Sequence, residues 1–163
     1  GLSFPLGIGW ADSTAFAVGA NNVSILIWYN LVTTNGSQVL VAKQNVNAQW
    51  EIFNNGTASL FLRGGSSSPQ VTTGSNPGAA AWHQVIGTIS GTAGNVYADG
   101  SSIGTGSVAA FTDASTILDV GRYMPGDASH IVGTVGLVQI ANVAWSSGDV
   151  STAWTNQRTL FGV

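Results

Sequence analysis

The chain has 163 residues, of which 44% are hydrophobic and only 7% charged, and it contains no cysteine. This hydrophobic content argues against a disordered chain, and the lack of cysteine excludes disulfides, thiolate chemistry and cysteine-based zinc sites. Four basic residues against seven acidic ones, a formal net charge of −3, cannot form the cationic stripe that nucleic acids require. No apolar run approaches the length of about 18 residues that predicts a membrane span. The length favours one domain over residues 1–163.

Short apolar segments separated by Gly, Asn, Ser and Pro clusters recur along the chain and predict strands. We place these strands at residues 23–31, 38–43, 50–54, 58–63, 82–90, 94–98, 101–104, 117–122 and 134–143. The dipeptides Asn55-Gly56 and Asp99-Gly100 predict tight hairpin turns, because a type I′ turn needs positive φ at both central residues. Residues 64–78 are predicted to form the longest polar loop. Many short strands with regular turns favour an all-β antiparallel sandwich or barrel.

One short helix is expected near the C-terminus. Ser146-Ser-Gly-Asp149 has the spacing of a capping box, in which the acid follows the capping Ser by three residues. Val150, Ala153 and Trp154 then fall on one face of a helix of one or two turns. We expect this apolar face to pack on a sheet.

Several segments resemble, in order, the motifs of the laminin-G-like (concanavalin A-like lectin/glucanase) superfamily. The matching segments are Ile25-Leu-Ile-Trp28, Trp82-His-Gln-Val-Ile-Gly-Thr88, Asn95-Val-Tyr-Ala-Asp-Gly100, Ile117-Leu-Asp-Val-Gly-Arg122, Gly133-Thr-Val-Gly-Leu-Val-Gln-Ile140 and Trp145-Ser-Ser-Gly-Asp-Val150. The resemblance spans roughly residues 20–152 and implies a jelly-roll β-sandwich. One departure is Gly136, which stands where the family usually has an acid.

The resemblance implies recognition of glycans, proteins or calcium-dependent partners. Glucanases of this superfamily carry clustered carboxylates on one strand, whereas this chain has the single glutamate Glu51. We therefore expect a non-catalytic surface recognition or adhesion module, not an enzyme, with glycan as the leading ligand class. His83, Trp28, Trp82 and Trp145 occupy motif positions and are expected to be structural, His83 with a satisfied hydrogen bond and the tryptophans in the core.

The expected ligand-binding residues gather in one loop. Residues 122–130 hold a cation, a phenol, a carboxylate and an imidazole in a chain that is otherwise poor in such groups, and loops on a rigid scaffold often carry recognition. The candidates are Arg122, Tyr123, Asp127 and His130, with Trp50 as an aromatic that would stack on a sugar if it were exposed. The alternative for this loop is a local salt bridge between Arg122 and Asp127.

No cofactor is expected, although Asp113, Asp119 or Asp127 would allow a calcium site. The expected partner is a glycan or a protein surface, outside the cell or on a virion.

Two other functions remain open. In the first, the chain is a structural subunit that decorates or builds an exterior assembly, such as a phage capsid, a tail or an extracellular filament. Its partners would then be further copies of itself, or capsid or fibre proteins. Alternatively, it would be an unusual glycoside hydrolase. Because the chain starts at Gly1, we expect a processed leader or a fragment.

Overall fold

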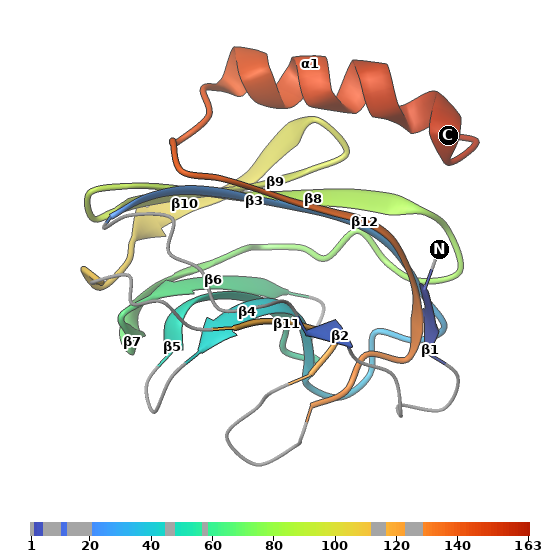
Figure 1. Ribbon diagram of the computed structural model, residues 1–163, viewed down its shortest axis with the longest axis horizontal. Coiled ribbons are helices and arrows are strands. Elements are labelled where there is room, and N and C mark those ends of the chain that lie inside the picture. The colour runs from blue at the N-terminus through green and yellow to red at the C-terminus, as the bar shows by residue number, and fades with distance from the viewer. Residues whose placement is uncertain are drawn as a thin grey trace.

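The computed structural model describes residues 2–4, 11–12, 21–44, 48–56, 59–111, 117–122 and 129–163. The described residues form two sheets that pack face to face, with one helix along the outer side of one sheet (Figure 1). None of the helices in these ranges is long and apolar enough to cross a membrane. This arrangement confirms the antiparallel β-sandwich with a C-terminal helix.

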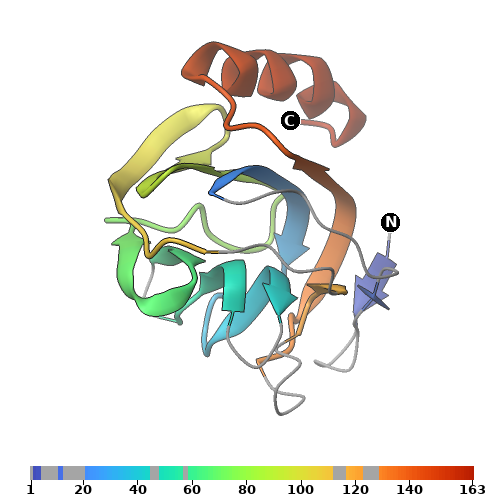
Figure 2. The same ribbon diagram turned by 60° about the vertical axis from the view of Figure 1, so that its left-hand side comes forward.

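We call the sheet beneath the helix the helix-side sheet. In spatial order it contains β1 (Leu2–Phe4), β12 (Gly133–Ala141), β3 (Asn22–Leu31), β8 (His83–Ser90), β9 (Ala93–Ala98) and β10 (Ser101–Ser107). The other, the far sheet, contains β2 (Ala11–Asp12), β11 (Leu118–Val120), β4 (Gln38–Gln44), β5 (Ala48–Asn54), β6 (Leu60–Gly64) and β7 (Ser66–Thr72). Neighbouring strands in both sheets are antiparallel. Figure 2 shows the two layers and the helix from a second side.

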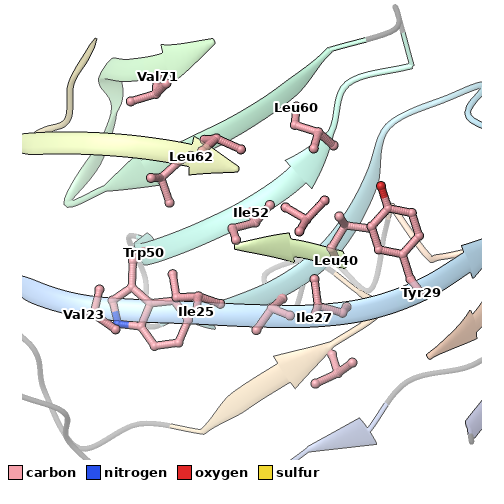
Figure 3. Close-up of a cluster of buried hydrophobic side chains, with 14 of the residues drawn as sticks. Val23, Ile25, Ile27, Tyr29, Leu40, Trp50, Ile52, Leu60, Leu62 and Val71 are labelled. Carbon is pink, nitrogen blue, oxygen red and sulfur yellow. The ribbon is translucent and has the colours of Figure 1, made fainter. Parts of the chain in front are cut away.

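The core lies between the two sheets, where apolar side chains from their inner faces meet (Figure 3). Strand β3 contributes Val23, Ile25, Ile27 and Tyr29 to this layer. The intervening residues of β3 point to the other side and are buried as well, so the strand reads as a nearly continuous apolar run. A strand covered on both faces has this composition. Strand β6 instead alternates between buried and half-buried positions, which indicates that the outer face of the far sheet is less covered.

Helix α1 spans Ser147–Gln157 and continues into a 3₁₀ turn, η2 (Arg158–Leu160). The predicted capping box is present: the Ser146 hydroxyl accepts from the Asp149 N–H, while the Asp149 carboxylate accepts from the Ser146 N–H. Val150 is fully buried, and Ala153 and Trp154 pack beside it. The predicted apolar face is confirmed, but the helix is longer than the expected one or two turns. The residues after Trp154 are polar, so the apolar periodicity that predicts a helix does not extend over them.

Two local expectations are wrong. The predicted loop at 64–78 contains β7, whose Ser-Pro sequence carries no strand signal but is tolerated because β7 lies at the edge of the far sheet. The connection between β5 and β6 is longer than the predicted Asn55-Gly56 turn, since Asn54 pairs with Leu60. The Asp99-Gly100 turn, with φ of 49° and 79°, has the predicted geometry.

Candidate functional site on the helix-free face

The outer face of the far sheet carries a row of mostly polar residues that runs across its strands. Cross-strand pairing places Asp119 beside Ala42, Ala42 beside Glu51, Glu51 beside Arg63 and Arg63 beside Gln70. The residues flanking these positions, such as Leu118 and Ile52, belong to the inner core, so the row points outward. We call this set the polar row.

An apolar row runs next to the polar row, two residues away along β5 and β6. Val39, Phe53 and Phe61 are cross-strand neighbours there. The two phenyl rings meet edge to face, with their centroids 4.8 Å apart. This geometry is favoured for aromatic pairs. It places a packed apolar cluster directly beside the charges, in which Val39 and Phe53 are buried and Phe61 is half-buried.

Arg63 joins the two rows and is held in one orientation. Its Nη1 donates to Glu51 Oε1 at 2.8 Å, and its Nε donates to Gln70 Oε1 at 2.6 Å. Its guanidinium carbon lies 4.1 Å from the centroid of the Phe53 ring, a cation–π contact. A guanidinium has five N–H groups, so others remain to donate to a ligand from this fixed position.

Glu51 supplies the acidic half of this pair from a buried position, with 2% of its side chain exposed. Burial raises the pKa of Glu51, while the charge and the hydrogen bond of Arg63 act in the opposite direction. The Arg63 guanidinium is thus a fixed donor beside an acceptor, the Glu51 carboxylate, and the two opposite charges cancel.

A hollow of about 280 Å³ opens over this pair. Its lining residues are Ser37, Val39, Glu51, Phe53, Arg63 and Ser129. Hydroxyls, a guanidinium, a carboxylate and the edge of an aromatic cluster thus converge on one depression. Neutral and anionic hydroxylated ligands offer the complementary donors, acceptors and C–H faces.

The expected binding loop reaches this hollow through its described C-terminal end. Ser129 lines the hollow, and its carbonyl accepts from the Val39 N–H. His130 follows directly and is half-buried. Tyr123 and Asp127 lie outside the described residues, so their expected roles stay predictions.

Two of the sequence candidates are held in other roles. Arg122 is buried, and its Nε lies 3.3 Å from Asp119 Oδ1, so the guanidinium serves an ion pair within the fold. The alternative pairing of Arg122 with Asp127 lies outside the described residues. Trp50 is fully buried between the sheets and is labelled in Figure 3, so the expectation that it stacks on a ligand is wrong.

The described residues bear on two further expectations, a calcium site at Asp113, Asp119 or Asp127 and a structural hydrogen bond at His83. Asp119 bonds to Arg122, while Asp113 and Asp127 lie outside the described residues. Within the described part of the chain, no group of three His, Asp or Glu side chains has the arrangement of a metal site. His83 has the expected structural bond, with Nδ1 lying 2.8 Å from Asp99 Oδ2.

Sequence reasoning missed Glu51, Arg63, Phe53 and Gln70. The available signal was strand alternation, because a buried Trp50 places its neighbour Glu51 on the opposite face. The predicted two-residue turn would have paired Glu51 with the wrong partner, and the pairing with Arg63 follows only from the longer connection.

Comparisons with known proteins agree with this fold. A family model described as "Concanavalin A-like lectin/glucanases superfamily" (Laminin_G_3) matches residues 8–151. No curated protein sequence matches the chain significantly.

Three solved structures share the fold at low sequence identity. A heptameric SAP-like pentraxin from Limulus polyphemus is 16% identical, with a TM-score of 0.78 over 94% of this chain and 80% of that one. The CBM40 domain of a Ruminococcus gnavus IT-sialidase, bound to α2,3-sialyllactose, is 12% identical, with a TM-score of 0.69 over 88% and 97%. Domain 4 of AbnA, an extracellular arabinanase from Geobacillus stearothermophilus in complex with arabinotriose, is 17% identical, with a TM-score of 0.65 over 83% and 68%.

Proposed function

Because the chain belongs to the concanavalin A-like lectin/glucanases superfamily, we propose that it is a non-catalytic glycan-recognition module whose site is the hollow on the helix-free face. The observation that carries this proposal is the fixed Arg63–Glu51 pair beside Phe53 at the base of that hollow. The structures of the CBM40 domain with sialyllactose and of the arabinanase domain with arabinotriose support glycan as the ligand class. We expect the module to act outside the cell, as the arabinanase does.

In this proposal the side chains have separate tasks. Arg63 donates its remaining N–H groups to ligand hydroxyls or to a ligand carboxylate, which its planar fork matches well. Ser37 and Ser129 exchange hydrogen bonds with hydroxyls at the rim of the hollow. The Phe53 ring, which lines the hollow, offers an apolar contact for a C–H group of a sugar ring.

Among the carboxylates that the structure describes, the arrangement supports binding without hydrolysis. Glu51 and Asp119 lie in one row with Ala42 between them, but Asp119 is fully buried and paired with Arg122. A glycosidase needs a second carboxylate that reaches the sugar or an attacking water. Incubation of the protein with the sugars tested below should therefore release no reducing ends.

The test is binding to a glycan array that includes arabinotriose and α2,3-sialyllactose, followed by calorimetry with the strongest ligand. The double variant Glu51→Gln/Arg63→Gln removes both charges together, so neither charge remains buried without its partner. A hydrogen bond to a charged group contributes about 1.5–3 kcal/mol, so we expect Kd to rise by about tenfold or more.

The matched control is Arg158→Gln, which removes one positive charge at the end of the helix and away from the hollow. Its affinity should equal that of the native protein. The proposal fails if no sugar on the array binds, or if the double variant binds as tightly as the control.

A further inference from the structure

A second, larger hollow lies on the opposite side of the molecule, between helix α1 and strand β12. Its volume is about 450 Å³, within the range of small-molecule sites. Its lining residues are Gln139, Val143, Ala144, Trp145, Asp149, Thr152, Ala153, Asn156 and Gln157. The helix contributes five of these at spacings of three or four residues, so a single side of α1 forms one wall. We call this depression the helix hollow.

The segment that carries Trp145 is fixed by a buried hydroxyl. Ser24 of β3 is almost fully buried, and its Oγ donates to the Val143 carbonyl at 2.7 Å. The same Oγ accepts from the Trp145 N–H at 2.8 Å. Trp145 itself is half-buried, packing against the cluster beneath the helix while it lines the hollow. Its indole is therefore presented from a rigid support, which lowers the entropic cost of binding.

Gln157 is oriented at the other end of the helix hollow. Its Oε1 accepts from Trp28 Nε1 at 2.7 Å and from Gln84 Nε2 at 3.1 Å. An indole N–H can only donate, so the oxygen must face Trp28 and the amide nitrogen must point away from it. That nitrogen has no hydrogen-bond partner among the described residues, and neither do the side chains of Gln139, Thr152 and Asn156.

We propose that the helix hollow is a second saccharide site, selective for neutral sugars. Three amides and a hydroxyl supply donors and acceptors for sugar hydroxyls, and Trp145 supplies an aromatic surface for a ring face. The proposal rests on the proposed glycan recognition and adds a second subsite with its own selectivity.

The selectivity follows from the charges of the lining. Among the described residues, no Lys, Arg or His lines the helix hollow, and Asp149 is the one charged residue that does. Hydrogen bonds from Ser146 lower the pKa of Asp149, so this carboxylate stays ionised in neutral and mildly acidic solution. An anionic sugar would meet a like charge and no counter-charge in the helix hollow, whereas Arg63 offers a cation in the hollow on the far sheet.

The experiment is a ¹H–¹⁵N NMR titration of the intact chain. The probes are neutral trisaccharides built from pentose, hexose or N-acetylhexosamine units, and α2,3-sialyllactose as the acidic sugar. The reporters are the Trp145 indole N–H, assigned with Trp145→Phe, the side-chain amides of Gln139 and Asn156, and the Arg63 Nε–H. We expect at least one neutral trisaccharide to shift the Trp145 and amide signals, and the acidic sugar to leave them unchanged.

A pair of helix variants tests whether those shifts come from the hollow. Thr152→Met fills it, whereas Thr155→Met places the same side chain on an exposed helix position outside the lining. Methionine is a good helix former at both positions. The shifts should disappear in Thr152→Met and persist both in Thr155→Met and in the Glu51→Gln/Arg63→Gln variant.

The outcomes separate the two proposals. Sugars that shift only the Arg63 signal overturn the helix hollow and leave the proposed function standing. Shifts at Trp145 that persist in Thr152→Met, or that the acidic sugar also produces, overturn the neutral site. If no sugar shifts either set of signals, both proposals fail.

Discussion

The outward-facing side chains of the two sheets are held in place in different ways. On the helix-side sheet, β3 and β8 turn Leu26, Trp28 and Ile86 outward, and helix α1 covers them. On the far sheet, β5 and β6 turn outward a charged pair and two phenyl rings, and the pair is fixed by hydrogen bonds and by its contact with a ring. The first face uses apolar burial for stability, whereas the second keeps polar groups in fixed positions near the solvent.

The difference explains where each hollow obtains its chemistry. Beneath helix α1 the cluster of Leu26, Trp28, Ile86 and Val150 is apolar, and the polar groups of the helix hollow lie at the side of α1 that faces β12. The outer face of the far sheet holds its charges in the sheet itself, so its hollow lies over the adjacent strands β4, β5 and β6. Uncharged amides and one carboxylate, that of Asp149, border the helix hollow, whereas an ion pair borders the hollow on the far sheet.

Removal of the Trp28 side chain should have the largest effect on this contrast. Trp28 is fully buried, stacks on Phe161 with a centroid distance of 4.2 Å and also stacks on Trp154. Truncation of such an aromatic costs about 3–5 kcal/mol, so Trp28→Ala should lose that much free energy of unfolding in urea. Phe61→Ala, on the half-buried rim of the far face, is the comparison and should cost distinctly less. Similar losses for the two variants would contradict the contrast.

Gly136 is expected to show the next largest effect. A Cβ at this position would collide with the Phe161 ring and would lie 3.1 Å from Trp82. The departure from the family's usual acid therefore has a structural reason, because the missing side chain makes room for the C-terminal aromatic. Overpacking costs about 1–3 kcal/mol, so Gly136→Ala should lower the free energy of unfolding by that amount in urea.

The matched control for this glycine is Gly74→Ala. A Cβ there has no atom within 4 Å, and the backbone does not have positive φ. The control should leave stability unchanged or raise it slightly, since alanine restricts the unfolded chain. A Gly136→Ala protein as stable as this control would mean that Phe161 does not dock in solution.

The capping box should contribute less than the glycine. Ser146→Ala removes the hydroxyl that accepts from the Asp149 N–H, and loss of such a cap costs about 1 kcal/mol. Ser147→Ala, one residue later and exposed, is the control and should change little. Thermal unfolding followed by circular dichroism measures both variants. Equal midpoints for the two would show that the cap does not hold the helix.

The sequence predicts one face of this molecule much better than the other. The apolar helical spacing of Val150 and Trp154 is a local signal, and it correctly predicts a helix that packs on a sheet. The ordered family motifs around Trp28 and Trp82 predict the sandwich itself. These features depend on residues close together in the chain or on a known pattern.

The far face depends on register, which the sequence leaves undetermined. Glu51 and Arg63 are twelve residues apart, and they become partners only because the connection between their strands is longer than the Asn55-Gly56 turn. A slip of one residue would turn an outward-facing residue inward. Adjacent strand residues point to opposite faces, so without the register the sequence does not show whether Trp50 or Glu51 faces outward. The sequence-based prediction of Trp50 as a binding residue is therefore wrong.

The smallest expected effect is a pH dependence that comes from the far face. Burial raises the pKa of Glu51 above its ordinary value of 4.5, so the folded state keeps this proton to a higher pH than the unfolded chain does. The contribution of this group to the free energy of unfolding therefore falls as the pH rises from about that ordinary value through the raised one, and is constant above it. Glu51→Gln lacks this titration, so the stability of the variant minus that of the native protein should increase with pH over this window. Urea unfolding at a series of pH values measures the difference.

Asp149→Asn on the helix side is the control, with the opposite sign. The pKa of Asp149 in the folded protein is lowered, so the stabilisation that this carboxylate provides is lost as the pH falls. The stability of Asp149→Asn minus that of the native protein should therefore decrease as the pH rises. Parallel trends in the two variants would show that burial does not govern the charge of Glu51, and the distinction between the two faces would then rest on packing alone.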